Sequence, residues 1–404
     1  MSVESYGERL DNNTIRRRRI LVVPSEYPDI GDPLKFYGNW AEEQTRAIAD
    51  YHDIAVVYPV MTTNGNQGIE CLDYHGVRTL IVNYRHVRKT WVSPYVFAAW
   101  KGLKQARVEM KPECIHAHGL FPAGFAAVLI GEVLRIPVVI TEHWGRLWER
   151  IAEGRLIAAV LKFTLRRATK VIAVSHFLAK EISNLAPYCS PDVVPNIVAD
   201  IFYAPPATTP PRSTDDFELL FVGSIRDSRK GVDVLLPALR TYLETPGARR
   251  CHLSIIGEGD KRREFEELTS RLDLQSCVTF LGNRSREEVA IAMAGCDLFV
   301  MPSRYETFGV VYAEAMASGK PVIACAGGPA EEIVPSWAGE LVPPGDYISL
   351  AHAIHRVTSN LEDYDRTRIS EYAKKSFGSQ AVVFALSKVY ERAIGDLDDN
   401  SGYK

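Results

Sequence analysis

The chain has 404 residues, too many for one small core, so we expect two domains. Its composition, 46% hydrophobic and 24% charged, is that of an ordinary soluble globular protein. No apolar run reaches the length of a membrane-spanning helix, and the N-terminus lacks the apolar segment of a signal peptide. These features exclude an integral membrane protein, and we expect a cytoplasmic one.

The seven cysteines are odd in number and scattered, and no two form a C-x-x-C pair. This pattern indicates reduced thiols and disfavours zinc and iron–sulfur sites.

Charge is distributed unevenly along the chain. The net charge of −3 combines +3 in residues 1–200 with −6 in residues 201–404. Residues 78–170 contain 16 basic residues and only 6 acidic ones. Such a region suits an anionic acceptor or an anionic lipid surface, but it equally suits a solvated face, and charge alone does not choose between them.

Buried strands alternate with helices in the N-terminal half. The strands are expected at 20–28, 53–60, 79–84, 114–118, 138–141, 170–175 and 192–196. The helices between them are expected at 40–51, 92–109, 123–134 and 151–167. This alternation predicts parallel βαβ units with right-handed crossovers.

A proline-rich linker, residues 199–216, interrupts the pattern, and a second series of strands and helices follows. Its strands are expected at 218–225, 252–259, 277–282, 297–303 and 321–328. Its helices are expected after Gly231, at 260–272 and 286–295, before Pro321, and at 379–394. The chain therefore contains two Rossmann-like halves of similar size.

Several nucleotide-binding classes are disfavoured. Neither half opens with G-x-G-x-x-G after its first strand, which argues against a nicotinamide dehydrogenase, and no Walker-A loop is present. Asp396-Leu397-Asp398 matches a metal-binding D-x-D, but it lies in the acidic tail, far from any strand end. We therefore read it as chance and expect no metal.

The most informative segment, residues 303–334, contains Glu306 and Glu314 with seven residues between them. Glu306 precedes a short helix whose first backbone N–H groups are free to bind an anion. This arrangement suits a sugar phosphate, with the phosphate at the helix N-terminus and hydroxyls on the two acids. The amides expected at the phosphate are those of Phe308, Gly309 and Val310.

This segment resembles the E-x7-E motif of retaining GT-B glycosyltransferases of family 4 type. The alternative is a surface helix with an ordinary pair of glutamates. The resemblance implies that Glu314 binds ribose hydroxyls and that Glu306 binds sugar hydroxyls. It also implies a GT-B architecture, in which two Rossmann-like domains face each other across the active-site cleft.

The loop that starts at Gly223 is rich in basic residues and ends in Lys230-Gly231 before a helix. Cations aimed at a departing nucleoside diphosphate would stabilise the transition state more than the ground state. The loop resembles the family's phosphate loop, with Lys230 in the position of the diphosphate-binding lysine. The family often has an arginine directly after the glycine, where this chain has Ser224, so either Arg226 or Arg229 would supply the second cation. An exposed basic loop is the alternative.

Two further strand ends of this half could border the nucleotide. Glu258 lies in the Gly-Glu-Gly that ends one strand, and Leu281 precedes the glycine that ends the next. The family binds the base there largely through backbone atoms, so the sequence does not distinguish uracil, guanine and adenine.

In the N-terminal half, His116 and His118 end a strand, where open α/β sheets line their clefts. Alternation places both side chains on one face, so either histidine could face the site. The resemblance favours His118, as the histidine that contacts the donor sugar. On the acceptor side we expect the next strand end, with Glu142 and His143, and a loosely matching loop that contains Gly31 and Gly38.

These observations predict a retaining, metal-independent glycosyltransferase with no cofactor, in which Lys230, Glu306 and His118 act at the reacting centre. We expect an acceptor domain at 1–198, a donor domain at 199–380, and a C-terminal helix and acidic tail at 381–404, the helix packing back toward the first domain. The donor would be a nucleotide-diphosphate sugar and the acceptor a saccharide, a lipid-linked molecule or another small molecule. Bacterial cell-envelope or exopolysaccharide synthesis is the expected setting, and no nucleic acid is expected as a partner. A GT-B epimerase or phosphorylase, or a non-catalytic sugar-nucleotide-binding subunit, are the alternatives.

Residues 84–107 interleave six cations with Trp91, Tyr95, Phe97 and Trp100. This pattern suits peripheral binding to an anionic bilayer at the inner face of the plasma membrane. It is equally the pattern of a crossover helix with its aromatic side chains in the core and its cations in solvent.

Overall fold

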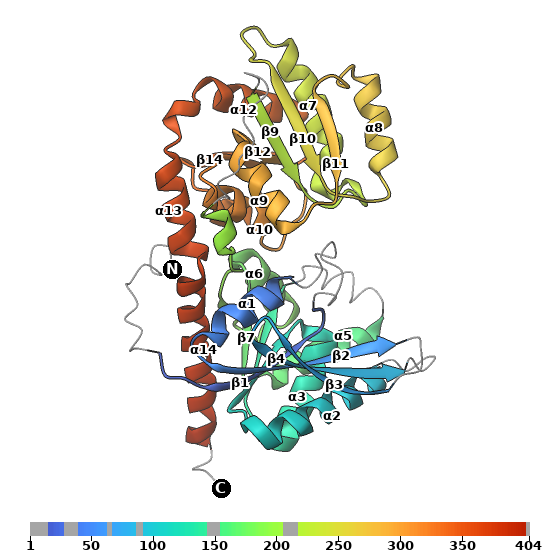
Figure 1. Ribbon diagram of the computed structural model, residues 1–404, viewed down its shortest axis with the longest axis vertical. Coiled ribbons are helices and arrows are strands. Elements are labelled where there is room, and N and C mark those ends of the chain that lie inside the picture. Colours follow the sequence, from blue (N-terminus) through green and yellow to red (C-terminus); the bar gives the residue numbers. More distant parts are fainter. Residues whose placement is uncertain are drawn as a thin grey trace. The chain divides into compact units, whose positions relative to one another are not determined.

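The computed structural model describes residues 15–27, 39–62, 67–85, 92–143, 154–204 and 217–400, and the last five of these in backbone only (Figure 1). The described residues form two compact units. The N-terminal unit comprises the residues up to Ile197 together with the helix that begins at Ser379, and the C-terminal unit runs from Val198 to Gly378.

An eight-stranded sheet forms the centre of the N-terminal unit, in the order β3-β4-β2-β1-β5-β6-β7-β8. All neighbouring strands are parallel except β3 and β4. The strands are β1 (Arg19–Pro24), β2 (Asp53–Thr62), β3 (Gly68–Tyr74), β4 (Val77–Arg85), β5 (Cys114–His118), β6 (Val138–Glu142), β7 (Lys170–Ala173) and β8 (Asp192–Val193). The order of the strands in the sheet reverses between β1 and β5: the chain adds strands on one side after β1 and on the other side from β5 on. The loops that follow β1 and β5 therefore meet at a topological switch point.

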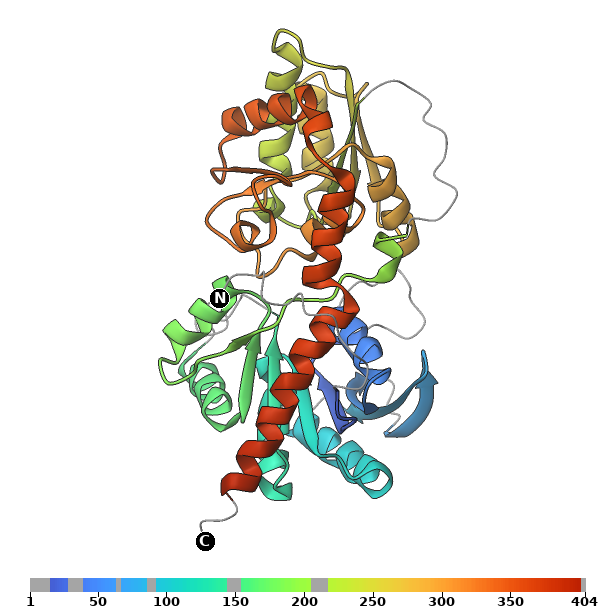
Figure 2. The ribbon, with the colours of Figure 1, turned by 90° about the vertical axis from the view of Figure 1, so that its left-hand side faces the viewer.

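Helices cover this sheet on both faces. They are α1 (Asn39–Ala49), α2 (Val92–Met110), α3 (Phe125–Leu134), α5 (Arg155–Arg167), α6 (His176–Leu185) and α14 (Ser379–Asn400). α2 packs on β2 and β4 and also contacts α3, whereas α14 packs with α1 and on β5 and β6. Figure 2 shows α14, in red, crossing these strands. The last helix of the chain thus completes the fold of the first half.

The C-terminal unit is built on six parallel strands in the order β11-β10-β9-β12-β13-β14. They are β9 (Phe217–Val222), β10 (Cys251–Ile256), β11 (Val278–Gly282), β12 (Leu298–Met301), β13 (Val322–Cys325) and β14 (Gly339–Val342). The order reverses between β9 and β12. The basic loop after β9 and the glutamate segment after β12 therefore leave the sheet side by side.

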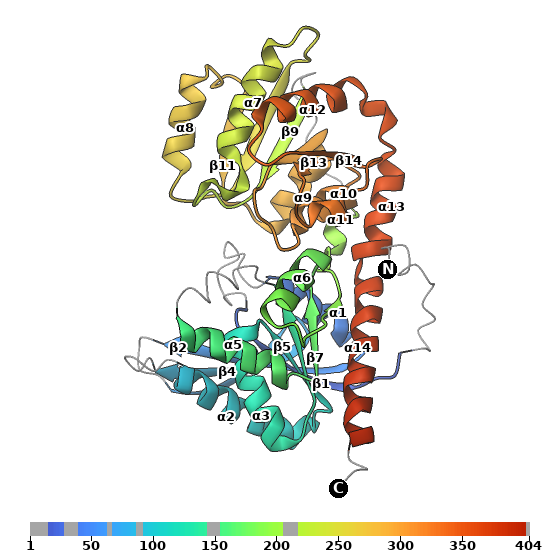
Figure 3. The same cartoon turned by 180° about the vertical axis from the view of Figure 1, so that it is seen from behind.

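In the described part of the C-terminal unit, α-helices pack on the second sheet and on one another (Figure 3). They are α7 (Val232–Glu244), α8 (Arg262–Arg271), α9 (Arg286–Gly295), α10 (Val310–Ala317), α11 (Ala330–Ile333), α12 (Tyr347–Ser359) and α13 (Arg366–Phe377). α7 packs with α8 and α12, while α10 packs with α9 and α13. The alternating α/β pattern predicted from the sequence is confirmed in both units.

The central strands are buried on both faces, which explains why they read as continuous apolar runs. All seven cysteines lie in the described residues and none forms a disulfide. Within the described ranges, no helix is long and apolar enough to cross a membrane.

Candidate active site

The basic loop after β9 is held in one conformation by its own side chains and by its neighbours. Asp227 begins a short turn by accepting a hydrogen bond from the Arg229 N–H at 3.0 Å. Gly231 then starts α7 with a φ of 83°, and a Cβ there would lie 2.1 Å from the Pro302 carbonyl oxygen. Only glycine fits at this position, because the segment after β12 passes directly against it.

The two acids of the glutamate segment lie at different depths. Gly309, with a φ of 78°, begins α10, and Glu306 precedes it with a largely buried side chain. Glu314 lies on α10 and is buried, with Oε1 3.5 Å from an Arg286 guanidinium nitrogen. Sequence reasoning missed Arg286, whose guanidinium also covers the ring of Phe202 at 5.5 Å.

A lysine–glutamate contact is one of those that join the basic loop to the glutamate segment. Lys230 Nζ donates to Glu306 Oε1 at 2.5 Å, across 76 residues of sequence. A lysine ammonium has three N–H donors, so this bond leaves donors for an anion. The structure thus brings together the lysine and the first glutamate that the sequence placed in one site.

Arg304, which sequence reasoning also missed, ties the same two segments together. Its guanidinium donates to both carboxylate oxygens of Asp233, at 2.9 and 2.8 Å, and to the Ser228 carbonyl. Its backbone N–H donates to the Arg229 carbonyl at 2.7 Å. The ion pair with Asp233 raises the pKa of Arg304. The only signal in the sequence was its position two residues before Glu306.

The two arginines predicted as second cation differ in their surroundings. Arg229 donates from Nε to Asp227 Oδ2 at 2.7 Å, within its own loop. Arg226 is exposed, and its backbone lies against Gly259, where a Cβ would be 2.2 Å from the Arg226 nitrogen. Both arginines remain candidates for the phosphate site.

The remaining predicted donor residues follow the same edge of the sheet. Gly223 follows β9 directly and packs so closely on Gly257 that a Cβ on Gly257 would lie 1.9 Å from the Gly223 oxygen. Glu258 forms an ion pair with Arg262, and Leu281 lies half-buried in β11. The edge thus continues from the basic loop toward β11.

In the N-terminal unit, buried hydrogen bonds distinguish the two histidines of β5. His116 has both ring nitrogens satisfied, by the Tyr390 hydroxyl and by the Thr141 hydroxyl, each at 2.8 Å. His118 Nδ1 lies 2.9 Å from His143 Nε2, and its Nε2 is buried without a hydrogen-bond partner in the described chain. His116 therefore has a structural role, and His118 is the one with an unused nitrogen.

The tautomer of His118 follows from its neighbours. Burial lowers the pKa of His143 to about 3, despite its hydrogen bond to Asn196, and it lowers the pKa of His118 well below its ordinary value. His143 Nδ1 donates to Asn196 Oδ1 at 3.0 Å, so His143 Nε2 carries no proton. That nitrogen accepts from His118 Nδ1–H, which leaves a lone pair on His118 Nε2. His118 is thus a neutral hydrogen-bond acceptor.

The predicted acceptor-side residues at the end of β6, Glu142 and His143, are both buried and form hydrogen bonds inside the protein. Glu142 accepts from the backbone N–H of Leu120 at 2.7 Å and from that of His143 at 3.0 Å. Glu142 thereby holds the irregular turn after His118, and His143 orients His118. Gly31 and Gly38 lie outside the described residues.

Two family models match the chain, one in each half. The model described as "Glycosyl transferases group 1" matches residues 209–376, and the model described as "Glycosyltransferase Family 4" matches residues 38–200. The chain belongs to the group 1 glycosyltransferases.

Relatives of this glycosyltransferase include an uncharacterized glycosyltransferase of Methanocaldococcus jannaschii, which is 28% identical over 319 residues, or 77% of this chain and 84% of that protein. Another is the 2-deoxystreptamine N-acetyl-D-glucosaminyltransferase of Streptomyces fradiae, 28% identical over 280 residues, or 64% of this chain and 65% of that protein.

Solved structures share the fold of this glycosyltransferase. Sucrose-phosphate synthase from Thermosynechococcus elongatus has a TM-score of 0.71 at 22% identity, with 93% of this chain and 98% of that chain covered. Anabaena HepE in complex with UDP-glucose has a TM-score of 0.71 at 20% identity, with 92% and 99% covered. The predicted GT-B fold class is confirmed.

Proposed function

We propose that this glycosyltransferase transfers a sugar, with retention and without a metal, from a nucleotide-diphosphate sugar to a saccharide, a lipid-linked molecule or another small acceptor. The contact between Lys230 and Glu306 carries this proposal. It places a cation suited to the diphosphate beside an acid suited to the sugar, within one unit and at its switch point. The solved complexes of HepE with UDP and with UDP-glucose support a donor of this class.

The donor would lie with its phosphates between the basic loop and the start of α10. Lys230 can bind a phosphate oxygen while it keeps Glu306 in place, because it has three donors. The free amides at Gly309 and Val310 and the dipole of α10 add positive potential at the same point. Glu314, deeper on α10, would accept from ribose hydroxyls, with Arg286 fixing its orientation.

These groups act on the leaving group. Negative charge accumulates on the diphosphate as the glycosidic bond breaks, and Lys230, an arginine of its loop and the amides would stabilise that charge most in the transition state. The leaving phosphate would take the proton of the acceptor hydroxyl on the same face of the sugar, which retains the configuration. No protein nucleophile is assigned.

His118 would accept a hydrogen bond from a donor-sugar hydroxyl through Nε2. Because this nitrogen is shielded from solvent, the hydroxyl reaches it only after a local rearrangement. A buried acceptor without a partner is costly, so the bond to the ligand would recover stability that the free protein lacks.

Metal independence rests on the cations of the donor site. Within the described residues, no group of three histidine, cysteine or acidic side chains could hold a metal ion. In this proposal, Lys230, arginine side chains and the start of α10 meet the charge of the diphosphate. Cell-envelope or exopolysaccharide synthesis in the cytoplasm, at the inner face of the membrane, remains the proposed setting.

The surface of α2 fits only part of the predicted membrane pattern. Phe97 is 59% exposed, with Lys101 Nζ 4.7 Å from its ring centre, which supports an outward aromatic and basic face. Tyr95, another aromatic residue of this segment, is 2% exposed and shares the inward face of α2 with Gly102, which fits the alternative of a crossover helix. Trp91 lies outside the described residues.

Turnover of labelled nucleotide sugars, followed by NMR of the product, tests the proposal. UDP-, GDP- and ADP-sugars would be offered with neutral and lipid-linked glycosides, and the anomeric configuration of the product read from its coupling constants. A product with the donor's configuration supports retaining transfer, and an inverted product would contradict it. Epimerised donor, a sugar phosphate formed from a polysaccharide, or binding without turnover would each identify one of the alternative functions.

A further inference from the structure

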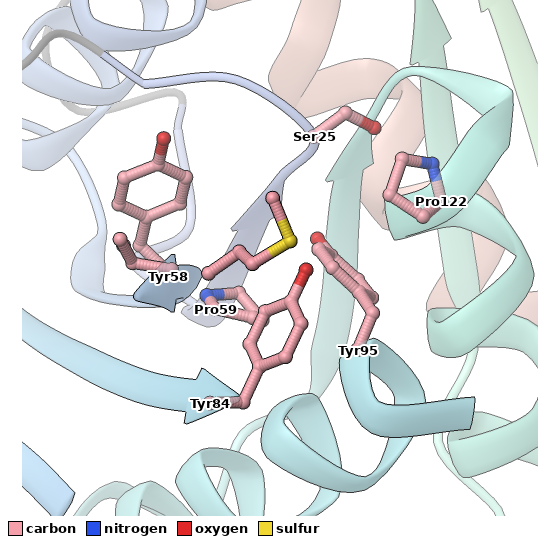
Figure 4. A pocket seen from close by; sticks show the side chains of 8 residues that line it. Ser25, Tyr58, Pro59, Tyr84, Tyr95 and Pro122 are labelled. Atoms are coloured by element: carbon pink, nitrogen blue, oxygen red, sulfur yellow. The ribbon is translucent and has the colours of Figure 1, made fainter. Parts of the chain in front are cut away.

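A pocket of about 520 Å³ opens in the N-terminal unit, and none of its lining residues is among the donor-site or acceptor-side residues assigned above (Figure 4). It lies at the carboxyl ends of β1, β2 and β4, beside the start of α2 and the turn after β5. The lining side chains belong to Ser25, Tyr58, Pro59, Val60, Met61, Tyr84, Tyr95 and Pro122. In an open α/β sheet this is the edge at which ligands bind.

Tyrosine rings form much of the wall. Tyr84 and Tyr95 meet edge to face, with ring centres 6.1 Å apart, and Tyr58 lies across the pocket from Tyr95 in Figure 4. Tyr95 is fixed by donating from its hydroxyl to the Pro24 carbonyl at 3.0 Å. The Tyr84 hydroxyl has no hydrogen-bond partner in the part of the chain that the structure describes, and it points into the pocket. It is therefore available to a ligand.

The pocket carries no charge on its described lining. None of the eight side chains is acidic or basic, and burial raises the pKa of Tyr84 and of Tyr95, which keeps both phenols neutral. A phosphate or carboxylate placed here would lose water without gaining a counter-ion. Exposed cations of this unit, such as Lys101 on α2, Lys162 on α5 and Arg85 at the end of β4, are not among the eight lining side chains.

The pocket adjoins the strand end that carries His118. Ser25, on its wall, donates its backbone N–H to the His118 carbonyl at 2.9 Å. The Ser25 hydroxyl accepts from the Ala123 N–H at 3.2 Å, and a Cβ on Gly119 would lie 2.7 Å from that hydroxyl oxygen. The pocket wall and the turn after β5 are thus packed tightly together at the switch point.

We propose that this pocket is the acceptor subsite and that it takes an uncharged saccharide ring. The apolar face of a pyranose would stack on the tyrosine rings, and its hydroxyls would bond to Tyr84 and Ser25. The inference rests on the proposed glycosyl transfer, because it supplies the acceptor for that reaction. It selects neutral saccharides over the anionic acceptors that the charge of the N-terminal half allowed.

Saturation-transfer NMR on the full chain tests the proposal with small probes. The panel is methyl α-D-glucopyranoside, methyl α-D-galactopyranoside and methyl α-D-mannopyranoside, against glucose 6-phosphate and glucosamine. At least one neutral glycoside should bind more tightly than either charged probe. Tyr84→Ala should weaken that binding about tenfold, and Tyr84→Phe by less, because the ring stays and only the hydroxyl is lost.

Two variants make the test specific. Tyr188→Phe, at a 49% exposed tyrosine outside the pocket, should leave glycoside binding unchanged. Met61→Lys adds a cation at a 49% exposed lining position and should shift the preference toward glucose 6-phosphate. Both variants keep the buried packing, so a change in probe preference reports on the pocket.

The assignment is overturned if no neutral glycoside binds, if a charged probe binds best to the wild-type protein, or if the Tyr84 variants bind like the wild type. Binding of UDP, GDP and ADP is measured on the same samples. If the wild-type protein binds a nucleotide but the glycoside results contradict the pocket, only this inference is refuted. If the wild-type protein binds none of the three nucleotides, the proposed function is refuted.

Discussion

Replacing His143 by phenylalanine tests how the protein prepares His118 for the donor sugar. The change keeps an aromatic ring where His143 stacks on His118, with ring centres 5.2 Å apart. It removes the nitrogen that accepts the His118 Nδ1 proton, and it leaves Asn196 without its donor. The tautomer of His118 is then no longer fixed, and Nε2 can become protonated and lose its lone pair.

The size of the effect follows from the charge state of the cluster. All the histidines involved are neutral, because burial lowers their pKa values, so the bond to the sugar hydroxyl is between neutral groups. Such a bond contributes about 1 kcal/mol, which predicts a loss of about fivefold in kcat/KM for His143→Phe. Tyr188→Phe, at a 49% exposed tyrosine outside this cluster, should keep the kcat/KM of the wild type.

Nitrogen-15 NMR of the imidazoles at pH 7 measures the tautomer directly. The wild type and Tyr188→Phe should show His118 protonated at Nδ1 only, and His143→Phe should show a mixture or the Nε2–H form. A wild-type His118 protonated at Nε2 would refute the reasoning. So would a His143→Phe variant with an unchanged tautomer and unchanged kcat/KM.

The same cluster predicts how stability depends on pH. The pKa values of His116 and His143 are lowered by burial to about 3, below the ordinary value of about 6.5 that they regain on unfolding. The unfolded chain therefore binds more protons below pH 6.5, and stability falls as the pH drops from there toward 3. Each of these two histidines should lower the free energy of unfolding by about 2 kcal/mol as the pH falls from 7 to 5. Denaturant unfolding should show a shallower loss for His143→Phe than for the wild type, and equal slopes would contradict the assignment.

Three further predictions concern the donor, the metal and the membrane. Lys230→Ala and Glu314→Ala should each weaken nucleotide binding by about 1.5–3 kcal/mol in calorimetry. The control Arg263→Ala, at an 89% exposed side chain, should bind like the wild type. Unchanged affinity in both site variants would mean that Lys230 and Glu314 do not belong to the donor site. Activity should survive EDTA, and restoration of a chelated enzyme by Mg²⁺ or Mn²⁺ would mean that a metal holds the diphosphate. The wild-type protein should co-sediment with anionic vesicles at low salt, and this binding should decrease as salt is added. The double variant Lys101→Glu with Phe97→Ser should bind less. No binding of the wild type at low salt would rule out the proposed membrane contact.

Elements whose apolar runs are buried on both faces could be predicted from the sequence, and elements defined by distant partners could not. The strands that carry His118, Lys230 and Glu306 at their ends were all predicted. β3 was not, because it is an antiparallel edge strand with a largely exposed pattern and pairs only with β4. β14 and the helices α12 and α13 were also missed, in the stretch between Pro335 and Phe377 for which no element was predicted.

The site shows the same division. Local motifs located Lys230, Glu306 and Glu314, because spacing along one loop or helix is visible in the sequence. Arg304 and Arg286 were missed, because their partners lie in other segments. Alternation could not separate His116 from His118, because the difference depends on Tyr390, 274 residues further along the chain. The tyrosine pocket was missed for the same reason, since four separate elements and a turn build it.

A crystal structure with a bound nucleotide-diphosphate sugar, chosen by thermal shift from UDP-, GDP- and ADP-sugars, tests the central claim most directly. The account predicts a phosphate oxygen within hydrogen-bond distance of Lys230 Nζ and of the amides at Gly309 and Val310, with a ribose hydroxyl on Glu314. A diphosphate bound elsewhere, or one held through a metal ion with Lys230 still bound to Glu306 alone, would contradict it.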